Sequence, residues 1–127
     1  MKQAEKRIGK LLAELNSRVV LVEGKRDEQA LASVGVATQV VKFSGKPGKI
    51  AETAAEAAAG RRVVLLYDFD DEGERKAAEM LELLQPIAAV DRQLRKRFKQ
   101  LFGCRTVEQL PHAIERLRKD INERKNE

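Results

Sequence analysis

Short apolar runs rich in β-branched residues alternate with stretches of helical spacing along most of the chain. The apolar runs predict strands at residues 19–24, 38–43, 63–67 and 87–90. The stretches of helical spacing predict helices at residues 2–15, 25–35, 49–60 and 72–85. Strands that alternate with helices indicate an α/β fold with a Rossmann-like arrangement. We expect about four mainly parallel strands, flanked by helices on both faces.

The pattern changes after residue 90, where two further helices are predicted and no strand follows. Residues 92–101 form the first, a basic helix that turns Leu94 and Phe98 inward. Thr106 and Gln109 have capping-box spacing for the second, which is predicted to run to about residue 123. The chain is therefore expected to be one domain, residues 1–127. Its α/β core spans about 18–90 and its basic helical C-terminal extension spans 91–127.

The composition is that of a protein in aqueous surroundings. Hydrophobic residues make up 43% of the 127 residues and charged residues 35%. No apolar run approaches the ~20 residues that span a bilayer, and the first residues lack the apolar centre of a signal peptide. We therefore expect a cytoplasmic protein that makes no contact with membranes.

The positive charge is concentrated at one end of the chain. Residues 1–90 carry 14 Lys and Arg against 14 Asp and Glu, whereas residues 91–127 carry 11 against 6. A basic end on a neutral body is typical of a surface that binds nucleic acid, RNA or DNA. The alternative is an ordinary solvated helical face. The candidate phosphate contacts here are Arg92, Arg95, Lys96, Arg97 and Lys99.

The scarcity of cysteine and histidine limits the kinds of metal site. Cys104 is the single cysteine and His112 the single histidine, so neither a disulfide framework nor a Cys/His zinc site fits within one chain. Any metal would be held by oxygen ligands, which favours Mg²⁺, Mn²⁺ or Ca²⁺.

Acidic residues follow two of the predicted strands. Glu23 ends the first, and Asp68 and Asp70 follow the third. Ligands of open parallel sheets bind at the carboxyl ends of the strands. If the backbone stays extended, alternation puts the two aspartates on the same side, which lets both reach one cation. The alternative is N-capping of the next helix. Gly73 is expected to let a ligand or the helix backbone come near.

Several cations lie close in sequence to these strand ends. The loop SGKPGK lacks the spacing of a P-loop, so nucleotide hydrolysis of that type is excluded, but its backbone could cradle a phosphate. Each of these cations could also be an ordinary surface residue. The candidates are Lys25, Lys46, Lys49, Arg75 and Lys76.

Together, VEGKRD at 22–27 and DFDDEG at 68–73 resemble the two signature motifs of the Toprim domain family. The resemblance covers about residues 18–90 and looks strongest to small stand-alone Toprim proteins and to the ribonuclease that matures 5S ribosomal RNA. It implies that Asp68 and Asp70 coordinate Mg²⁺, with Mn²⁺ as a substitute. It also implies that Glu23 acts as general acid or base and can share the metal.

The resemblance favours a magnesium-dependent nuclease, a hydrolase or phosphotransferase of the RNA-processing or DNA-repair type. The chain has no room for the gate of a topoisomerase or the nucleotide-binding regions of a primase. A second interpretation is a non-catalytic module that binds nucleic acid or a protein partner in a larger assembly. A third is a haloacid-dehalogenase-like phosphatase, although Asp71 stands where such enzymes carry Thr or Val.

Overall fold

A parallel sheet lies at the centre of the computed structural model, which describes residues 3–42 and 45–125 and the side chains up to residue 119. Its strands are β1 (Val19–Val22), β2 (Val40–Lys42) and β3 (Val63–Leu65), in the order β2-β1-β3. The middle strand, β1, pairs in parallel with both neighbours and is buried along its whole length. A strand buried on both faces reads as a continuous apolar run, which is why VVLV could be recognised in the sequence.

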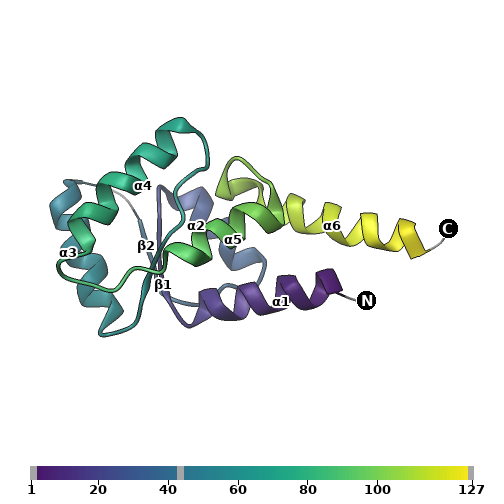
Figure 1. The fold of residues 1–127 in the computed structure, drawn as a ribbon, viewed down its shortest axis with the longest axis horizontal. Helices are drawn as coiled ribbons and strands as arrows, with labels where there is room; N and C mark the ends of the chain where they lie inside the picture. The colour runs from purple at the N-terminus through teal and green to yellow at the C-terminus, as the bar shows by residue number, and fades with distance from the viewer. Residues whose placement is uncertain (1–2, 43–44, 126–127) are drawn as a thin grey trace.

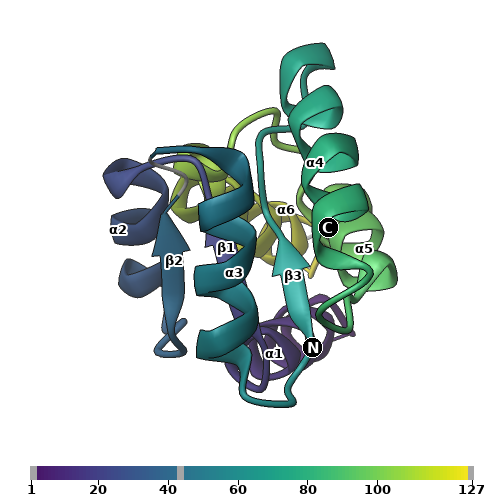
Figure 2. The same ribbon diagram turned by 90° about the vertical axis from the view of Figure 1, so that its left-hand side faces the viewer.

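Helices cover both faces of this sheet (Figures 1 and 2). The helical segments are α1 (Gln3–Asn16), α2 (Lys25–Ser33), α3 (Pro47–Ala58), α4 (Asp71–Leu84), α5 (Arg92–Phe102), the 3₁₀ turn η1 (Val107–Gln109) and α6 (Leu110–Lys125). Helices α3 and α4 pack on one face, against Val19 and Leu21. Helices α1, α2, α5 and α6 pack on the other, against Val20 and Val22. The alternation of side chains along β1 thus feeds two separate cores.

The predicted fourth strand at residues 87–90 does not form. Val90 makes a single parallel bridge to Val63, in which the Val63 N–H donates to Ala89 O at 2.8 Å and the Asp91 N–H donates to Val63 O at 2.9 Å. Asp91 then caps α5, because its Oδ1 accepts the Leu94 N–H at 3.0 Å. The cap turns the chain into a helix before a second pair of ladder bonds can form.

The other elements agree with the sequence pattern to within a few residues. The second strand is Val40–Lys42; the residues Phe43 and Ser44, assigned above to that strand and the loop after it, lie outside the described part of the chain. The last helix is preceded by η1, whose N-cap Thr106 makes the predicted capping box with Gln109.

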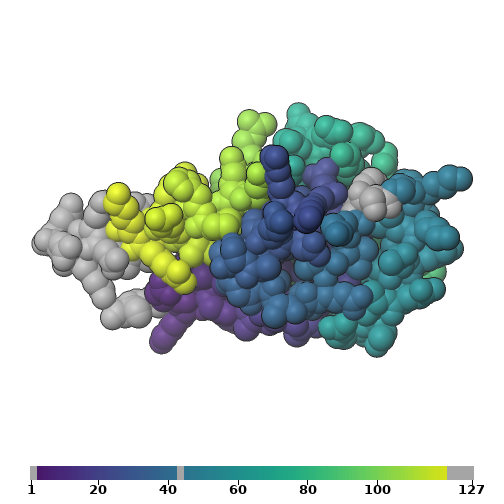
Figure 3. Space-filling model, turned by 180° about the vertical axis from the view of Figure 1, so that it is seen from behind, coloured from purple at the N-terminus to yellow at the C-terminus, as the bar shows by residue number. Residues whose placement is uncertain are grey.

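The C-terminal helices are part of the packing around the sheet. Phe98 of α5 and Ile114 of α6 belong to the same apolar core as Leu11 of α1, and Figure 3 shows α6 beside α1 at one end of the molecule. The Arg118 Nε lies 2.7 Å from Glu5 Oε1 across these two helices. Among the described residues, no helix combines the length and the apolar content needed to cross a membrane.

Candidate metal and nucleic-acid site

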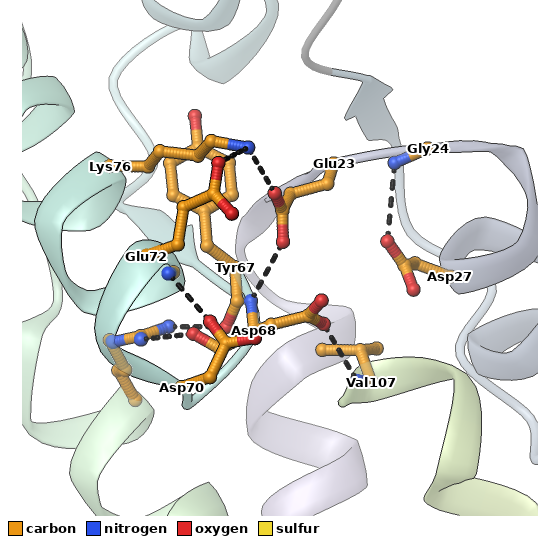
Figure 4. Close-up of polar contacts among 11 residues, drawn as sticks. Glu23, Gly24, Asp27, Tyr67, Asp68, Asp70, Glu72, Lys76 and Val107 are labelled. Atoms are coloured by element: carbon orange, nitrogen blue, oxygen red, sulfur yellow. Dashed lines mark hydrogen bonds and ion pairs between the residues drawn. The ribbon is translucent and has the colours of Figure 1, made fainter. Parts of the chain in front are cut away.

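Glu23 and Asp68 meet at the carboxyl end of the sheet. Glu23 follows β1 directly and Asp68 lies three residues beyond β3, and the two strands are neighbours in the sheet. The Asp68 backbone N–H donates to Glu23 Oε2 at 3.1 Å (Figure 4). Parallel strands bring their carboxyl ends to one edge, so residues 45 positions apart in sequence become direct neighbours.

The other oxygen of Glu23 binds a lysine from the first turns of α4. The Lys76 Nζ donates to Glu23 Oε1 at 2.8 Å and lies 3.5 Å from Glu72 Oε1 (Figure 4). Burial opposes ionisation of Glu23, but the hydrogen bonds from Lys76 and from the Asp68 N–H outweigh it and lower the pKa of Glu23. Glu23 is therefore held as a carboxylate, with a tethered cation beside it.

For Asp68, the interactions that oppose ionisation outweigh those that favour it. Its Oδ1 accepts the Val107 N–H of η1 at 3.2 Å, which favours the charged form. Burial and the neighbouring charge of Glu23 act against that form and raise the pKa of Asp68 to about 6. A carboxylate with so little compensation within the chain has the electrostatic character of a cation ligand.

Asp70 is engaged by its own helix, and coordination of one ion by Asp68 and Asp70 together stays a prediction. Asp70 is the N-cap of α4, and its Oδ1 accepts the Gly73 N–H at 2.7 Å. The capping alternative therefore describes Asp70 as it stands. Within the described residues, no group of three or more Asp, Glu, His or Cys side chains is placed to hold a metal ion.

The carboxylates of Glu23 and Asp68 by themselves suit a hard divalent ion. Mg²⁺ is usually bound by one or two protein carboxylates, with water and substrate phosphate completing its octahedron. Glu23 and Asp68 supply such a pair, at a sheet edge where neither is fully buried. The donor chemistry fits magnesium or manganese and excludes a softer metal.

Gly73 is required at this edge by its packing. A Cβ added at Gly73 would lie 2.0 Å from Asp68 O and 2.5 Å from Asp68 C. These are backbone atoms and cannot yield as a flexible side chain would. The glycine thus lets the start of α4 press directly on the Asp68 peptide, as the sequence predicted for the helix backbone.

The predicted cations near the strand ends surround the site unevenly. Lys76 contacts Glu23, whereas Arg75 points to Glu79 of its own helix at 2.7 Å. Lys25 is exposed at the start of α2, and Lys46 and Lys49 are exposed at the start of α3. Of this set, only Lys76 is brought to the carboxylates.

The five basic residues of α5 separate into two groups. Arg92, Lys96 and Lys99 are exposed and line a groove of about 340 Å³ between α4 and α5. Arg97 instead pairs with Glu14 of α1 at 2.5 Å, and Arg95 turns toward the main chain of β3. The sequence pattern predicts that Arg92, Lys96 and Lys99 point outward, and all three are exposed. Nucleic-acid contact by the five basic residues stays a prediction.

Three contributors to the site were not foreseen from the sequence. One is the Val107 N–H, which carries no side-chain signal. Another is the pairing of Lys76 with Glu23. The third is the inward turn of Arg95, which the spacing of Arg95, Phe98 and Phe102 on one helical stripe could have indicated. Asp27, the last residue of the VEGKRD motif, is buried and accepts the Gly24 N–H at 3.2 Å, and burial raises its pKa.

The structure is thus an α/β domain with carboxylates at the ends of two adjacent parallel strands, which is where open parallel sheets bind their ligands. The family model described as "Toprim domain" matches residues 18–101. The chain belongs to the Toprim domain family, whose members are metal-dependent modules that act on nucleic acid.

Relatives with similar sequence occur in archaea. A UPF0292 protein from Thermococcus sibiricus is 39% identical over 101 residues, which are 79% of this chain and 77% of that protein. A UPF0292 protein from Pyrococcus furiosus is 37% identical over 78 residues, which are 61% of this chain and 58% of that protein. The second match thus spans less than two thirds of the relative's length.

A solved structure has the same fold. A protein from Aquifex aeolicus superposes with a TM-score of 0.67 at 29% identity. The superposition covers 82% of this chain and 94% of that chain.

Proposed function

We propose that this protein is a magnesium-dependent nuclease or RNA-processing phosphotransferase that acts on nucleic-acid phosphodiesters. The observation that carries the proposal is the direct contact between Glu23 and Asp68 at the carboxyl end of the sheet, with Lys76 beside them. Membership of the Toprim family supports a metal-dependent, nucleic-acid-directed role.

Glu23 and Asp68 would hold the ion, which when bound would neutralise the phosphate and align the attacking oxygen. Glu23, whose ionised form the chain stabilises, would accept or return a proton at the reacting oxygen. Lys76 would contact a phosphate oxygen once substrate enters, because its cationic form is stabilised here. By family resemblance Asp70 would be a further ligand, and it would bind the ion through the oxygen that does not cap α4.

The nucleic acid would be gripped mainly through its phosphates. Arg92, Lys96 and Lys99 form an exposed basic row on α5. They are spaced four and three residues apart, so they lie along one face of the helix. Lys25, Lys46 and Lys49 would add contacts on the other side of the carboxylates. Such contacts give affinity that depends on salt and little on base sequence.

A second candidate is a non-catalytic module that binds nucleic acid or a protein partner. The observation that favours it is the engagement of the carboxylates by the chain itself: Lys76 occupies Glu23, and Asp70 caps α4. In that case the basic row would still bind nucleic acid, but no bond would be broken.

One experiment separates these candidates. The purified protein is incubated with end-labelled structured RNA and DNA in Mg²⁺, in Mn²⁺ or in EDTA, and cleavage is followed on denaturing gels. We expect cleavage that needs the ion and falls at least about 100-fold in Glu23→Gln, because proton transfer typically contributes 10²–10⁴-fold.

Glu56→Gln is the matched control, because Glu56 is exposed on α3, away from the site, and loses the same charge. Binding without cleavage in either ion would favour the non-catalytic module. Cleavage that persists in EDTA or in Glu23→Gln would contradict the proposed enzyme.

A further inference from the structure

Arg95 binds the main chain at the end of β3 and just beyond it, through both terminal nitrogens of its guanidinium. Its Nη1 donates to Leu65 O at 3.0 Å and to Tyr67 O at 2.7 Å, and its Nη2 donates to Asp68 O at 3.0 Å. Nη2 also pairs with Glu74. The guanidinium lies 4.5 Å from the centre of the Phe69 ring, and the side chain is only 13% exposed.

Two of these carbonyls, those of Leu65 and Tyr67, are ones that a fourth strand would have bound. Along β3, Val63 directs its N–H and its carbonyl to the segment that carries Ala89 and Asp91. In a parallel ladder, alternate residues face the same neighbour, so Leu65 and Tyr67 face the same outer edge as Val63. Because the chain enters α5 at Arg92, no strand reaches them, and the Arg95 side chain takes its place.

The bond to Tyr67 O has a consequence for the site. Tyr67 C=O and Asp68 N–H belong to one planar peptide group, whose oxygen and hydrogen point in opposite directions. Arg95 binds this group at its oxygen, and Glu23 Oε2 binds it at its N–H. The next carbonyl, Asp68 O, is held by Arg95 as well.

We infer that Arg95 is a positioning residue that fixes the Asp68 backbone and thereby sets the placement of Asp68 and Glu23 toward each other. It touches neither carboxylate and is assigned no contact with substrate. The part of this inference that concerns the metal rests on the proposed function; the part that concerns the backbone does not.

Arginine has the geometry that this role requires. Its guanidinium presents five donors in a rigid plane, so it can serve three carbonyls and a carboxylate together while it stacks on Phe69. The ammonium of lysine is a compact point charge that cannot span these acceptors. Arg95→Lys therefore keeps the positive charge and removes the planar set of donors.

The test compares Arg95→Lys with Arg97→Lys, which lies on the same helix but pairs with Glu14 of α1. Mg²⁺ affinity is measured by titration calorimetry, and amide hydrogen exchange of the Asp68 N–H is measured by NMR in EDTA. We expect Arg95→Lys to weaken Mg²⁺ binding about tenfold or more, as removal of residues behind metal ligands commonly does. We also expect it to speed exchange of the Asp68 amide about tenfold, whereas Arg97→Lys should change neither.

Mg²⁺ affinity and amide exchange test separate parts of the inference. A wild-type protein that binds no Mg²⁺ would overturn the proposed function, and the exchange data would still decide whether Arg95 fixes the backbone. If Arg95→Lys has the same Asp68 amide exchange rate and the same Mg²⁺ affinity as the wild type, the inference is overturned. If Arg95→Lys does not fold, Arg95→Gln is measured in the same way. Failure of both variants to fold would assign Arg95 to stability alone and would also overturn it.

Discussion

Asp68 is a carboxylate that the metal-free chain stabilises poorly. Burial and the charge of Glu23 raise its pKa to about 6, although the Val107 N–H partly compensates. Since an unfolded aspartate titrates near 3.9, the folded chain takes up a proton more readily than the unfolded chain between these values. Ionisation of Asp68 therefore costs stability at neutral pH, and the cost disappears as the pH falls toward 4.

Asp68→Asn should therefore stabilise the metal-free protein at pH 7–8, by about 1 kcal/mol after allowance for solvent screening. The amide oxygen can still accept the Val107 N–H, and the charge is gone. The advantage should shrink below pH 6 and vanish near pH 4. Melting temperatures in EDTA across this range provide the measurement, with the exposed Glu56→Gln as control. An advantage that does not change with pH would show that ionisation of Asp68 is not its source.

At the residue scale, the positions of Glu23 and Asp68 could be predicted, because acidic residues that follow apolar strands indicate the carboxyl edge of a parallel sheet. The position of Asp70 could not, because capping and metal ligation use the same residue type at the same place. The helical spacing of Arg95 could have indicated its inward turn. Its partners could not be predicted, since they are carbonyls left open by a strand that does not form. Contacts set by the tertiary fold leave little trace in local spacing.

At the scale of elements, the strands and helices up to residue 84 follow from periodicity alone. The segment 87–90 has the composition of a strand, but composition does not say whether a neighbour is in reach for more than one pair of bonds. Asp91 decides the outcome, because its capping bond to the Leu94 N–H starts α5 at once. A strong local cap overrides a weak strand preference.

The contact between α4 and the Asp68 backbone yields a prediction for glycine substitutions. Gly73→Ala should destabilise the protein by about 2 kcal/mol or more, because the new methyl group would overlap Asp68 O and force the backbone to move. Gly9→Ala, at an exposed position within α1 where a Cβ meets no atom within 4 Å, should stabilise by about 0.5–1 kcal/mol. Denaturant unfolding measures both; a stable Gly73→Ala would contradict the close approach.

At the scale of the whole molecule, the surplus positive charge of α5 is exposed on only a limited part of the surface. Arg97 forms an ion pair between α5 and α1, and Arg95 binds the main chain of β3. The exposed cations that line the α4–α5 groove are then Arg92, Lys96 and Lys99. The total charge was visible in the sequence. The division between structural and exposed cations was not, because all five lie on one short helix.

The exposed row should determine how salt affects nucleic-acid binding. Replacing Arg92, Lys96 and Lys99 together with Gln should lower the slope of log affinity against log salt by about 2–3, since each phosphate contact contributes about 0.7–0.9. The control replaces Lys6, Arg7 and Lys10, three exposed residues of α1, and changes the net charge equally. Fluorescence anisotropy at several salt concentrations gives the slopes. Equal slopes for the two triple variants would mean that net charge, not this row, governs binding.

The closed outer edge of β3 also bears on how the protein can associate. Exposed edges of sheets recruit strands from other molecules, which leads to domain swapping and fibres. The bridge to Val90 and the guanidinium of Arg95 occupy the acceptors of β3, so this edge offers no template. The opposite edge is β2, three residues long and ending at Lys42, which pairs with Glu28 at 3.5 Å. Ordered aggregation on heating would therefore have to start from β2.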